Sequence, residues 1–491
     1  MTQYQFVALT LSVIGPLLAL ALALRLPPSL VMFATGLLAA VLPGLPELHV
    51  DPNLVLTLFL PPLLYASTVR VSWHLLRLTL LPGVVLGCAL VGATIGLVAT
   101  AARLMMPMLG WTSALLLGSV TAVFDTRLFH EAKGRPHVPR AISDTLKARE
   151  LVGRVFILAT FSLALDAVEP GRLSIWLVVE HFLLDIPLGA LLGSAIGYAT
   201  VRVRERIDPA PVEIAVSIAM PYAAALAATG LGLSIVATVT AAALVVNAVR
   251  IDRETGAPIS SSETRVSAVA FWEQASLMIS AAVFFLAGLA MPEALQAFTS
   301  WPGWHAALTA GGLLAIVLTV QFTFSLAAAG LDPVAGALEA REPRGRARGA
   351  AAAIMAWAST RSVIGLLLAL SIPVAANIER GLILVLAALV ILGSILLQGL
   401  TLRRVLEVAG FHEGQEDARE EETARRVMQA AAQAPGREHA SGHNAARQAL
   451  LSLREADRVG DEVLSSVLKE VDLSERVAEG DALPGAGPPN P

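Results

Sequence analysis

The sequence predicts an all-α polytopic membrane protein with a helical, soluble tail. Apolar residues make up 55% of the 491 residues and charged residues only 15%. The mean hydropathy of +0.68 is far above that of a soluble globular chain. Charged residues of both signs are concentrated after about residue 411. We therefore expect a transmembrane domain over residues 1–410 and a tail over residues 411–491.

Long apolar segments recur along the first part of the chain. A helix needs roughly 20 apolar residues to cross the hydrocarbon core, and lipid-exposed irregular backbone is excluded because its polar groups would have no partners. About 13 segments fit this length. The expected spans are 5–24, 28–45, 52–68, 78–102, 111–129, 150–168, 174–200, 211–229, 231–249, 268–290, 304–329, 350–373 and 381–402.

The distribution of Lys and Arg predicts how these spans are oriented. Alternate loops hold most of them, with the densest groups at 127–147 and 341–348. The other loops hold little beyond Arg103, Arg172 and Arg380. Because cytoplasmic loops carry the positive charge, we expect the N-terminus outside and the C-terminus in the cytoplasm. The first residues lack the Lys or Arg of a cleaved signal, so the first span should be retained.

Composition also excludes several classes of function. The net charge is only -4 and no basic run alternates with aromatic residues, so no nucleic acid partner is expected. The one cysteine, Cys88, allows neither an intramolecular disulfide nor a cysteine metal cluster. Histidines are scattered and no phosphate-binding glycine loop is present, so we expect no metal, no cofactor and no ATP-driven pump.

Two spans contain residues that favour a broken helix. Pro61 and Pro62 lie within the third span, and the fifth span starts with a Gly/Ser/Thr-rich stretch. In transporters, the ends of half-helices lie at the bilayer midplane, where their dipoles hold ions. Ordinary kinking is the alternative, because Pro and Gly are common in membrane helices.

Ionisable residues within the spans are candidates for a functional site, since each costs free energy at membrane depth. Asp125 lies in a helix of small residues and is the best candidate to titrate or to contact an ion. Glu150 and Arg154 are four residues apart, so they share one helix face and can form an ion pair. The alternative for this pair is a salt bridge near the cytoplasmic surface.

Three further charged residues have weaker functional interpretations. Asp185 lies near Pro187, where a hydrogen bond that kinks the helix competes with a role in ion binding. Glu273 lies near the cytoplasmic end of its span and can reach solvent. Arg361 is deeper, remains charged, and requires a carboxylate partner, so a structural clamp is its leading interpretation.

Several motifs resemble the cation:proton antiporters of the sodium/proton exchanger type. They are Leu60-Pro61-Pro62-Leu63-Leu64, Phe271-Trp272-Glu273, the segment Trp357–Pro373 with Arg361 on the family's arginine, and Gln398-Gly399-Leu400. The resemblance implies an inverted-repeat architecture and exchange of Na⁺ or K⁺ for protons by alternating access. It also implies a homodimer in the bacterial plasma membrane and an ion site where unwound helices cross.

The chain departs from this family at the ion site. The family's Thr-Asp-Pro falls on Phe124-Asp125-Thr126, and its Asn-Asp falls on Gly153-Arg154. An arginine has no oxygen for a cation and does not release a proton. We therefore expect an ion and proton site of Asp125, Thr126, Glu150 and Arg154, with Arg154 lying as a tethered cation against Asp125.

The partner of Arg361 is also changed. The family's glutamate partner falls on Arg149, which has the wrong sign, and Glu150 is its expected substitute in a structural ion pair. Arg149, Asp185 and Glu273 remain secondary site candidates.

Three functions are compatible with these residues. The first is a monovalent cation:proton antiporter that uses Asp125, with Glu150 replacing part of the lost site. The second is a non-exchanging protein of the same fold whose site is locked by Arg154 and which acts in regulation through its tail. The third is transport of an anion or organic ion attracted by the added arginines.

The tail contains two segments in which apolar residues recur every three or four positions, Ala446–Arg454 and Asp461–Leu473. This spacing predicts two amphipathic helices. They are expected to pair across a dimer or to pack under the membrane domain, while residues 483–491 are expected to be disordered.

Overall fold

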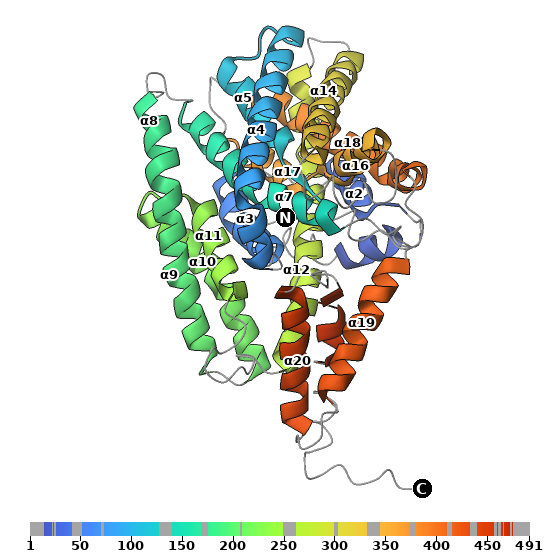
Figure 1. The fold of residues 1–491 in the computed structure, drawn as a ribbon. Coiled ribbons are helices and arrows are strands. Elements are labelled where there is room, and N and C mark those ends of the chain that lie inside the picture. Colours follow the sequence, from blue (N-terminus) through green and yellow to red (C-terminus); the bar gives the residue numbers. More distant parts are fainter. Residues whose placement is uncertain are drawn as a thin grey trace.

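Helices form most of the chain in the computed structural model (Figure 1). It describes residues 14–21, 23, 26–41, 52–69, 73–126, 140–167, 175–206, 209–248, 262–298, 303–330, 344–373, 379–409, 415–432, 439–455, 459, 463–464, 466–471 and 474. Within the described residues, the elements before the tail are α2 (Pro28–Val41), α3 (Pro52–Thr68), α4 (Trp73–Met105), α5 (Trp111–Ala122), β1 (Phe124–Asp125), α7 (Arg140–Asp166), α8 (Ile175–Glu180), the π-helical turn η1 (His181–Asp185), α9 (Ile186–Arg204), α10 (Ala210–Gly230), α11 (Ile235–Ala248), α12 (Ser262–Leu289), α13 (Met291–Leu295), the 3₁₀ turn η2 (Gln296–Phe298), α14 (Gly303–Ala329), α16 (Arg344–Ala358), β2 (Thr360–Arg361), α17 (Val363–Leu370) and α18 (Arg380–Val408).

The polytopic prediction is confirmed at a coarse level. Among the described residues, six helical stretches are long and apolar enough to cross a membrane: Val85–Met105, His181–Arg204, Ala210–Gly230, Ser267–Leu289, Trp304–Ala329 and Arg380–Val408. Four shorter apolar helices accompany them. The count of about 13 spans and their orientation stay predictions, and most of the expected span 5–24 overlaps residues outside the described set.

Of the two interpretations of Pro61 and Pro62, a broken helix is excluded, because α3 runs through both residues. A proline at position 62 cannot donate to the carbonyl four residues earlier, that of Leu58. The hydroxyl of Tyr222 on α10 donates to that carbonyl instead, at 3.0 Å. A neighbouring helix thus supplies the missing donor, so the polar backbone group is satisfied and the helix continues.

The fifth span does break, although not at its start. The α5 helix is continuous to Ala122, and the chain is then extended through β1. A second helix, α16, ends at Ala358 and is followed by the extended segment β2. The two segments pair antiparallel, with Phe124 opposite Arg361 and Asp125 opposite Thr360.

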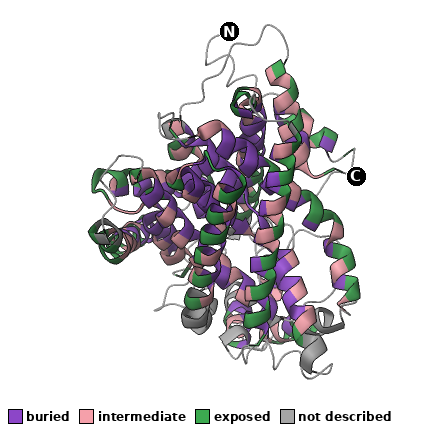
Figure 2. Cartoon of the chain, turned by 90° about the horizontal axis from the view of Figure 1, so that it is seen from above, coloured by how far each residue is buried: buried purple, intermediate pink, exposed green. Residues whose placement is uncertain are grey.

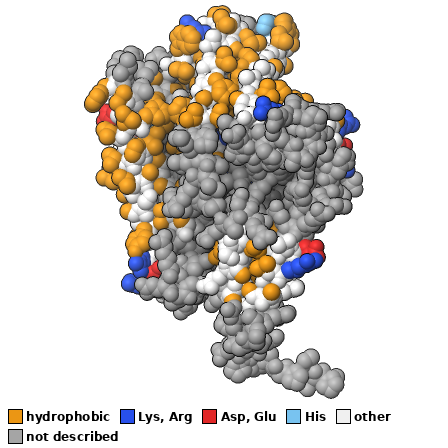
Figure 3. All heavy atoms as spheres, in the orientation of Figure 1, with side chains coloured by type: hydrophobic (Ala, Val, Ile, Leu, Met, Phe, Trp, Pro, Cys, Tyr) orange, Lys and Arg blue, Asp and Glu red, His pale blue; other side chains and the backbone are white. Residues whose placement is uncertain are grey.

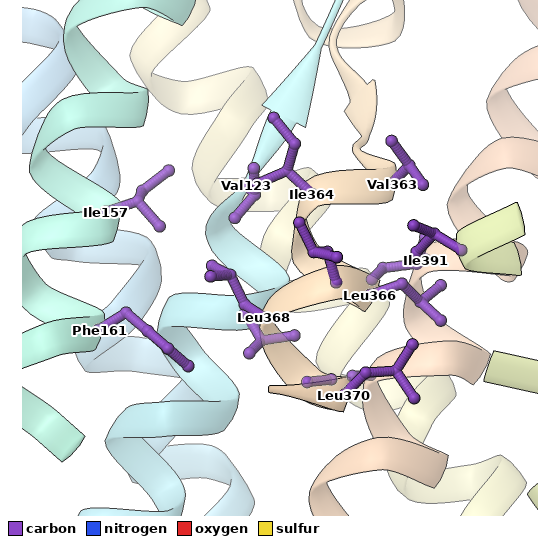
Figure 4. Close-up of a cluster of buried hydrophobic side chains, with 14 of the residues drawn as sticks. Val123, Ile157, Phe161, Val363, Ile364, Leu366, Leu368, Leu370 and Ile391 are labelled. Carbon is purple, nitrogen blue, oxygen red and sulfur yellow. The ribbon is translucent and has the colours of Figure 1, made fainter. Parts of the chain in front are cut away.

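The short helix α17 follows this crossing and lies at the centre of the core. All eight of its residues are buried, and Figure 4 shows its side chains beside Val123, Ile157 and Phe161. Figure 2 shows buried residues gathered in the middle of the bundle and exposed residues around its periphery. The crossing therefore lies next to a fully buried helix in the core.

The outer helices expose large apolar side chains, as expected for contact with lipid. Leu183, Leu188 and Leu191 on the α9 side are 66%, 47% and 67% exposed. Figure 3 shows hydrophobic side chains along this face, with charged side chains at its lower end. An apolar surface of this extent marks a membrane or protein contact rather than a solvated face.

Close packing of α9 on α11 depends on small residues. A Cβ atom added at Gly193 would lie 2.0 Å from the carbonyl oxygen of Thr238. One added at Gly197 would lie 2.6 Å from that of Ala242. Small residues allow membrane helices to approach in this way and to gain dispersion contacts.

The tail forms a separate apolar cluster. Its helices are α19 (Gln415–Ala432) and α20 (His439–Glu455). Ala424, Leu450, Val459, Val467 and Val471 pack together. The expected segment at 446–454 lies in α20, and the described residues between 463 and 471 are helical. The helix α19 was not predicted as amphipathic, because its charges obscure a narrow apolar stripe; residues 483–491 lie outside the described set.

We expect Gly193→Ala to destabilise the protein by about 1–3 kcal/mol through overpacking of α9 against α11. The melting temperature of the purified protein in detergent measures this loss. Gly96→Ala is the matched control, because nothing lies within 4 Å of a Cβ at that helical position. Equal melting temperatures for the two variants would contradict the close approach.

The tail should loosen in acid. A hydrogen bond from Arg425 lowers the pKa of Glu470. A depressed pKa stabilises the fold above the unfolded value of about 4.3, and this contribution is lost as the pH falls through the folded pKa. Hydrogen exchange of α19 should therefore accelerate in acid in the wild type, after correction for intrinsic rates. The dependence should be reduced in Glu470→Gln and retained in Glu422→Gln, which alters only a pair within α19.

Candidate functional site

The crossing of β1 and β2 leaves helix ends inside the protein. The last carbonyl groups of a helix have no partners within it and carry a partial negative charge. Arg361 donates from Nη1 to the carbonyl oxygens of Thr121 and Ala122, both at 3.1 Å, and so caps α5. The guanidinium charge also complements the dipole of that helix end.

Two glutamines cap the end of α16. The side-chain nitrogen of Gln321, on α14, donates to the carbonyl oxygens of Ala356 and Ser359 at 2.7 and 2.6 Å. The side-chain nitrogen of Gln398, on α18, donates to the carbonyl oxygen of Ala356 at 3.0 Å. The next helix, α17, is capped by Ser362, whose hydroxyl accepts from the amide of Ile364 at 3.3 Å. Each break is thus satisfied by buried side chains, as a low-dielectric interior requires.

Arg361 and Glu150 were expected to form an ion pair, but among the described residues no ion pair joins them. Besides the end of α5, Arg361 donates from Nη2 to the side-chain oxygen of Gln321 and to the carbonyl oxygen of Ser359. Its backbone amide donates to the hydroxyl of Ser394 at 3.1 Å. Carbonyl dipoles and an amide therefore replace the carboxylate that the sequence analysis required for this cation.

Glu150 and Arg154 do form the ion pair that their spacing allows, and they form it in the interior. The guanidinium binds Oε1 of Glu150 and the hydroxyl of Ser67 on α3. The other carboxylate oxygen, Oε2, accepts from the amide and the hydroxyl of Thr126, at 3.1 and 2.8 Å. The side chain of Arg154 is only 4% exposed and that of Glu150 only 15%, so this is not a solvated pair at the membrane boundary. It connects α7 to the end of β1.

Arg154 does not form the expected contact with Asp125. Within the described part of the chain, no ion pair joins the two residues. Arg154 instead bonds to Glu150, which lies four residues earlier on α7, and to the hydroxyl of Ser67. Asp125 itself is half-buried on β1, and its carbonyl oxygen accepts from the hydroxyl of Thr360 at 3.4 Å. Asp125 attracts the guanidinium of Arg361 electrostatically.

Arg149, which was only a secondary candidate, is buried at the end of α16. It is 2% exposed and donates to the hydroxyls of Ser325 and Ser359, at 3.1 and 2.8 Å. It also donates to the carbonyl oxygen of Met355 at 3.3 Å, in the last turn of α16. Arg149 is therefore a second guanidinium placed at a broken helix end.

The other two secondary candidates lie elsewhere. Asp185 bonds to Nδ1 of His181 at 2.9 Å within the π-helical turn η1, in keeping with a local hydrogen bond in an irregular helix. Glu273 is exposed on α12, whereas its neighbour Trp272 is buried against Tyr65 with ring centroids 4.6 Å apart.

Several residues that bond at the crossing were not predicted from the sequence. Gln321 is an amide within an apolar helix, and a polar residue in such a helix could have marked it as a site candidate. The serines Ser67, Ser325, Ser359 and Ser394 gave none, since serine is common in membrane helices as a small residue. Among the described residues, no group of three His, Cys, Asp or Glu side chains could hold a metal ion.

The comparisons with known proteins agree with this architecture. Residues 9–408 match the family model described as sodium/hydrogen exchanger, transmembrane. The chain is 28% identical over 400 residues to the Na⁺/H⁺ antiporter NhaP of Pseudomonas aeruginosa, which covers 77% of this chain and 90% of that protein. It is 28% identical over 407 residues to an uncharacterised Na⁺/H⁺ exchanger of Mycobacterium tuberculosis, with coverage of 81% and 72%.

A solved structure has the same fold. The sodium proton antiporter MjNhaP1 of Methanocaldococcus jannaschii, at pH 8, superposes with a TM-score of 0.59 and 16% identity over 83% of this chain and 98% of that one. The family match covers most of the chain and is supported by this fold. The chain belongs to the sodium/hydrogen exchanger family, whose members are membrane transporters rather than enzymes.

Proposed function

We propose that the protein exchanges a monovalent cation, Na⁺ or K⁺, for protons across the plasma membrane, with Asp125 as the carboxylate that binds either one. The observation that carries this proposal is the place of Asp125 on an unwound segment between buried helix ends. Irregular backbone at membrane depth is tolerated where it is buried in protein or lines a cavity. Oxygen atoms at such a crossing are the ligands that a hard cation uses.

Thr126 and Glu150 support Asp125 in this proposal. The carboxylate of Glu150 binds both polar groups of Thr126, the residue after Asp125. Arg154 neutralises Glu150, so the pair adds little net charge to the site while it fixes the end of β1. Asp125 then carries the charge change when a proton replaces a cation.

A locked site is the second candidate, and the position of Arg154 favours it. Its guanidinium is buried beside Glu150, in the part of α7 where the family has an aspartate. A cation fixed by covalent attachment competes with any cation that would use Glu150. In this form the protein would not exchange ions and would act through its tail.

The proposal includes the setting of the site. Two copies form a homodimer in the plasma membrane, each with its own crossing, and the tail lies in the cytoplasm. The family resemblance supports the dimer, and the distribution of Lys and Arg between alternate loops supports the orientation.

Asp125→Asn should reduce cation-driven proton flux in proteoliposomes to background, because an amide neither releases a proton nor carries the charge. The assay adds Na⁺, K⁺ or Li⁺ and follows an internal pH dye. Asp166→Asn, an exposed change at the end of α7, should leave flux intact. Flux in the wild type that persists in Asp125→Asn would exclude Asp125 as the exchanging group. Flux driven only by anions would favour the third function.

Arg154→Gln separates exchange from the locked site. A guanidinium about 10 Å from a bound cation opposes its binding by roughly 1.7 kcal/mol at an effective dielectric constant of about 20. The active exchanger should therefore show a lower KM for the cation, by about 15-fold. A locked protein would show no flux in the wild type and would gain it in the variant. An unchanged KM in an active protein would place Arg154 and Glu150 outside the ion route.

A further inference from the structure

The crossing contains an aromatic ring next to two buried cations. Phe124 on β1 is 3% exposed. The guanidinium carbon of Arg149 lies 5.5 Å from the centroid of its ring, and that of Arg361 lies 5.6 Å from it. Arg149 comes from α7 and Arg361 from β2, so the ring contacts two elements that are far apart in sequence.

These two arginines create an electrostatic problem for the fold. Both are almost fully buried, at 2% and 4% exposure, and their charges repel each other. Their hydrogen bonds go to neutral hydroxyls, carbonyls and an amide, and within the described residues no carboxylate forms an ion pair with either one. Their Nε atoms are buried without a hydrogen-bond partner. Asp125 attracts Arg361, and Glu150 attracts Arg149, although among the described residues neither forms an ion pair with the arginine that it attracts. Two like charges in a low-dielectric interior are stabilised by any further negative field close to both.

The ring supplies such a field without adding charge. The face of an aromatic ring is the negative part of its quadrupole and attracts a guanidinium within about 6 Å of the centroid. Desolvation strengthens this attraction. Both guanidiniums satisfy that distance, and both also cap broken helix ends, Arg361 at α5 and Arg149 at α16.

We propose that Phe124 is a positioning residue that holds Arg149 and Arg361 at the two helix ends and thereby fixes Asp125, the next residue, at the crossing. The effect on transport rests on the proposed exchange function, whereas the effect on the two arginines does not. Phe124 acts through its neighbours and contributes no oxygen to an ion.

Gly153 makes room for this ring. A Cβ atom at residue 153 would lie 3.3 Å from Cγ2 of Val91, tighter than ordinary packing, and 3.4 Å from Cε1 of Phe124, in van der Waals contact. The ring of Phe124 therefore lies close to Gly153, and a larger side chain at residue 153 would meet it.

The test is a double-mutant cycle between Phe124 and Arg149, with melting temperature in detergent as the first measurement. Phe124→Leu keeps an apolar side chain but removes the quadrupole. We expect it to lower the melting temperature strongly when Arg149 is present, and by less than half as much in the Arg149→Met background, where only one cation remains. Phe161→Leu, on α7 in the same core and 2% exposed, is the matched control and should show no coupling to Arg149→Met.

The second measurement is the exchange kinetics of the same variants. Phe124→Leu should displace Asp125 and therefore raise the KM for the cation. In the double variant with Arg149→Met, the KM should be lower than in Phe124→Leu alone. Additive melting temperatures, or a coupling no larger than that of Phe161→Leu, would overturn the proposed attraction. Coupling in stability with an unchanged KM would overturn the positioning role. Flux that is insensitive to Asp125→Asn would overturn the exchange proposal. If the stability coupling persisted in that case, the proposed attraction of Phe124 for the two arginines would still stand.

Discussion

The rest of this structure depends on one constraint: the carbonyl groups at the ends of two broken helices need hydrogen-bond donors from elsewhere in the protein. Helices α5 and α16 both end inside the protein, where water is not available to complete their hydrogen bonds. Buried Arg361, Arg149, Gln321 and Gln398 supply the donors. The crossing that presents Asp125 exists because these side chains from α7, β2, α14 and α18 converge on it. The stability of the crossing therefore depends on donors from four separate elements.

Charge balance distinguishes this site from the family pattern. Arg149, Arg154 and Arg361 lie near the crossing together with Asp125 and Glu150, so among the described residues the cations outnumber the carboxylates in this group. The excess is accommodated by weak partners spread over several elements: helix-end carbonyls, serine hydroxyls, the amide of Gln321 and the ring of Phe124. A buried charge without a counterion is costly, so the fold depends on all of these partners to hold the guanidinium groups at the crossing.

Sequence predicted the parts of the fold that depend on local composition. The apolar spans follow from their length, and the Glu150–Arg154 pair follows from helical spacing. Tertiary partners were not predictable in the same way. Pro61 and Pro62 do not break α3, because Tyr222 lies on another helix within reach of Leu58. Arg361 donates to carbonyl groups at the end of α5, and among the described residues no ion pair joins it to Glu150. The contact of Phe124 with Gly153 depends on residues 29 positions apart meeting in space, which periodicity does not encode.

The most direct measurement of the central claim is cation binding to the purified protein at different pH values. If Asp125 at the crossing binds a cation and a proton in turn, Na⁺ or K⁺ should raise the melting temperature at alkaline pH and lose this effect in acid, where the proton occupies the carboxylate. A shift of equal size at all pH values, after correction for ionic strength with choline, would contradict competition between the cation and the proton for Asp125. So would the absence of any shift with Na⁺, K⁺ or Li⁺.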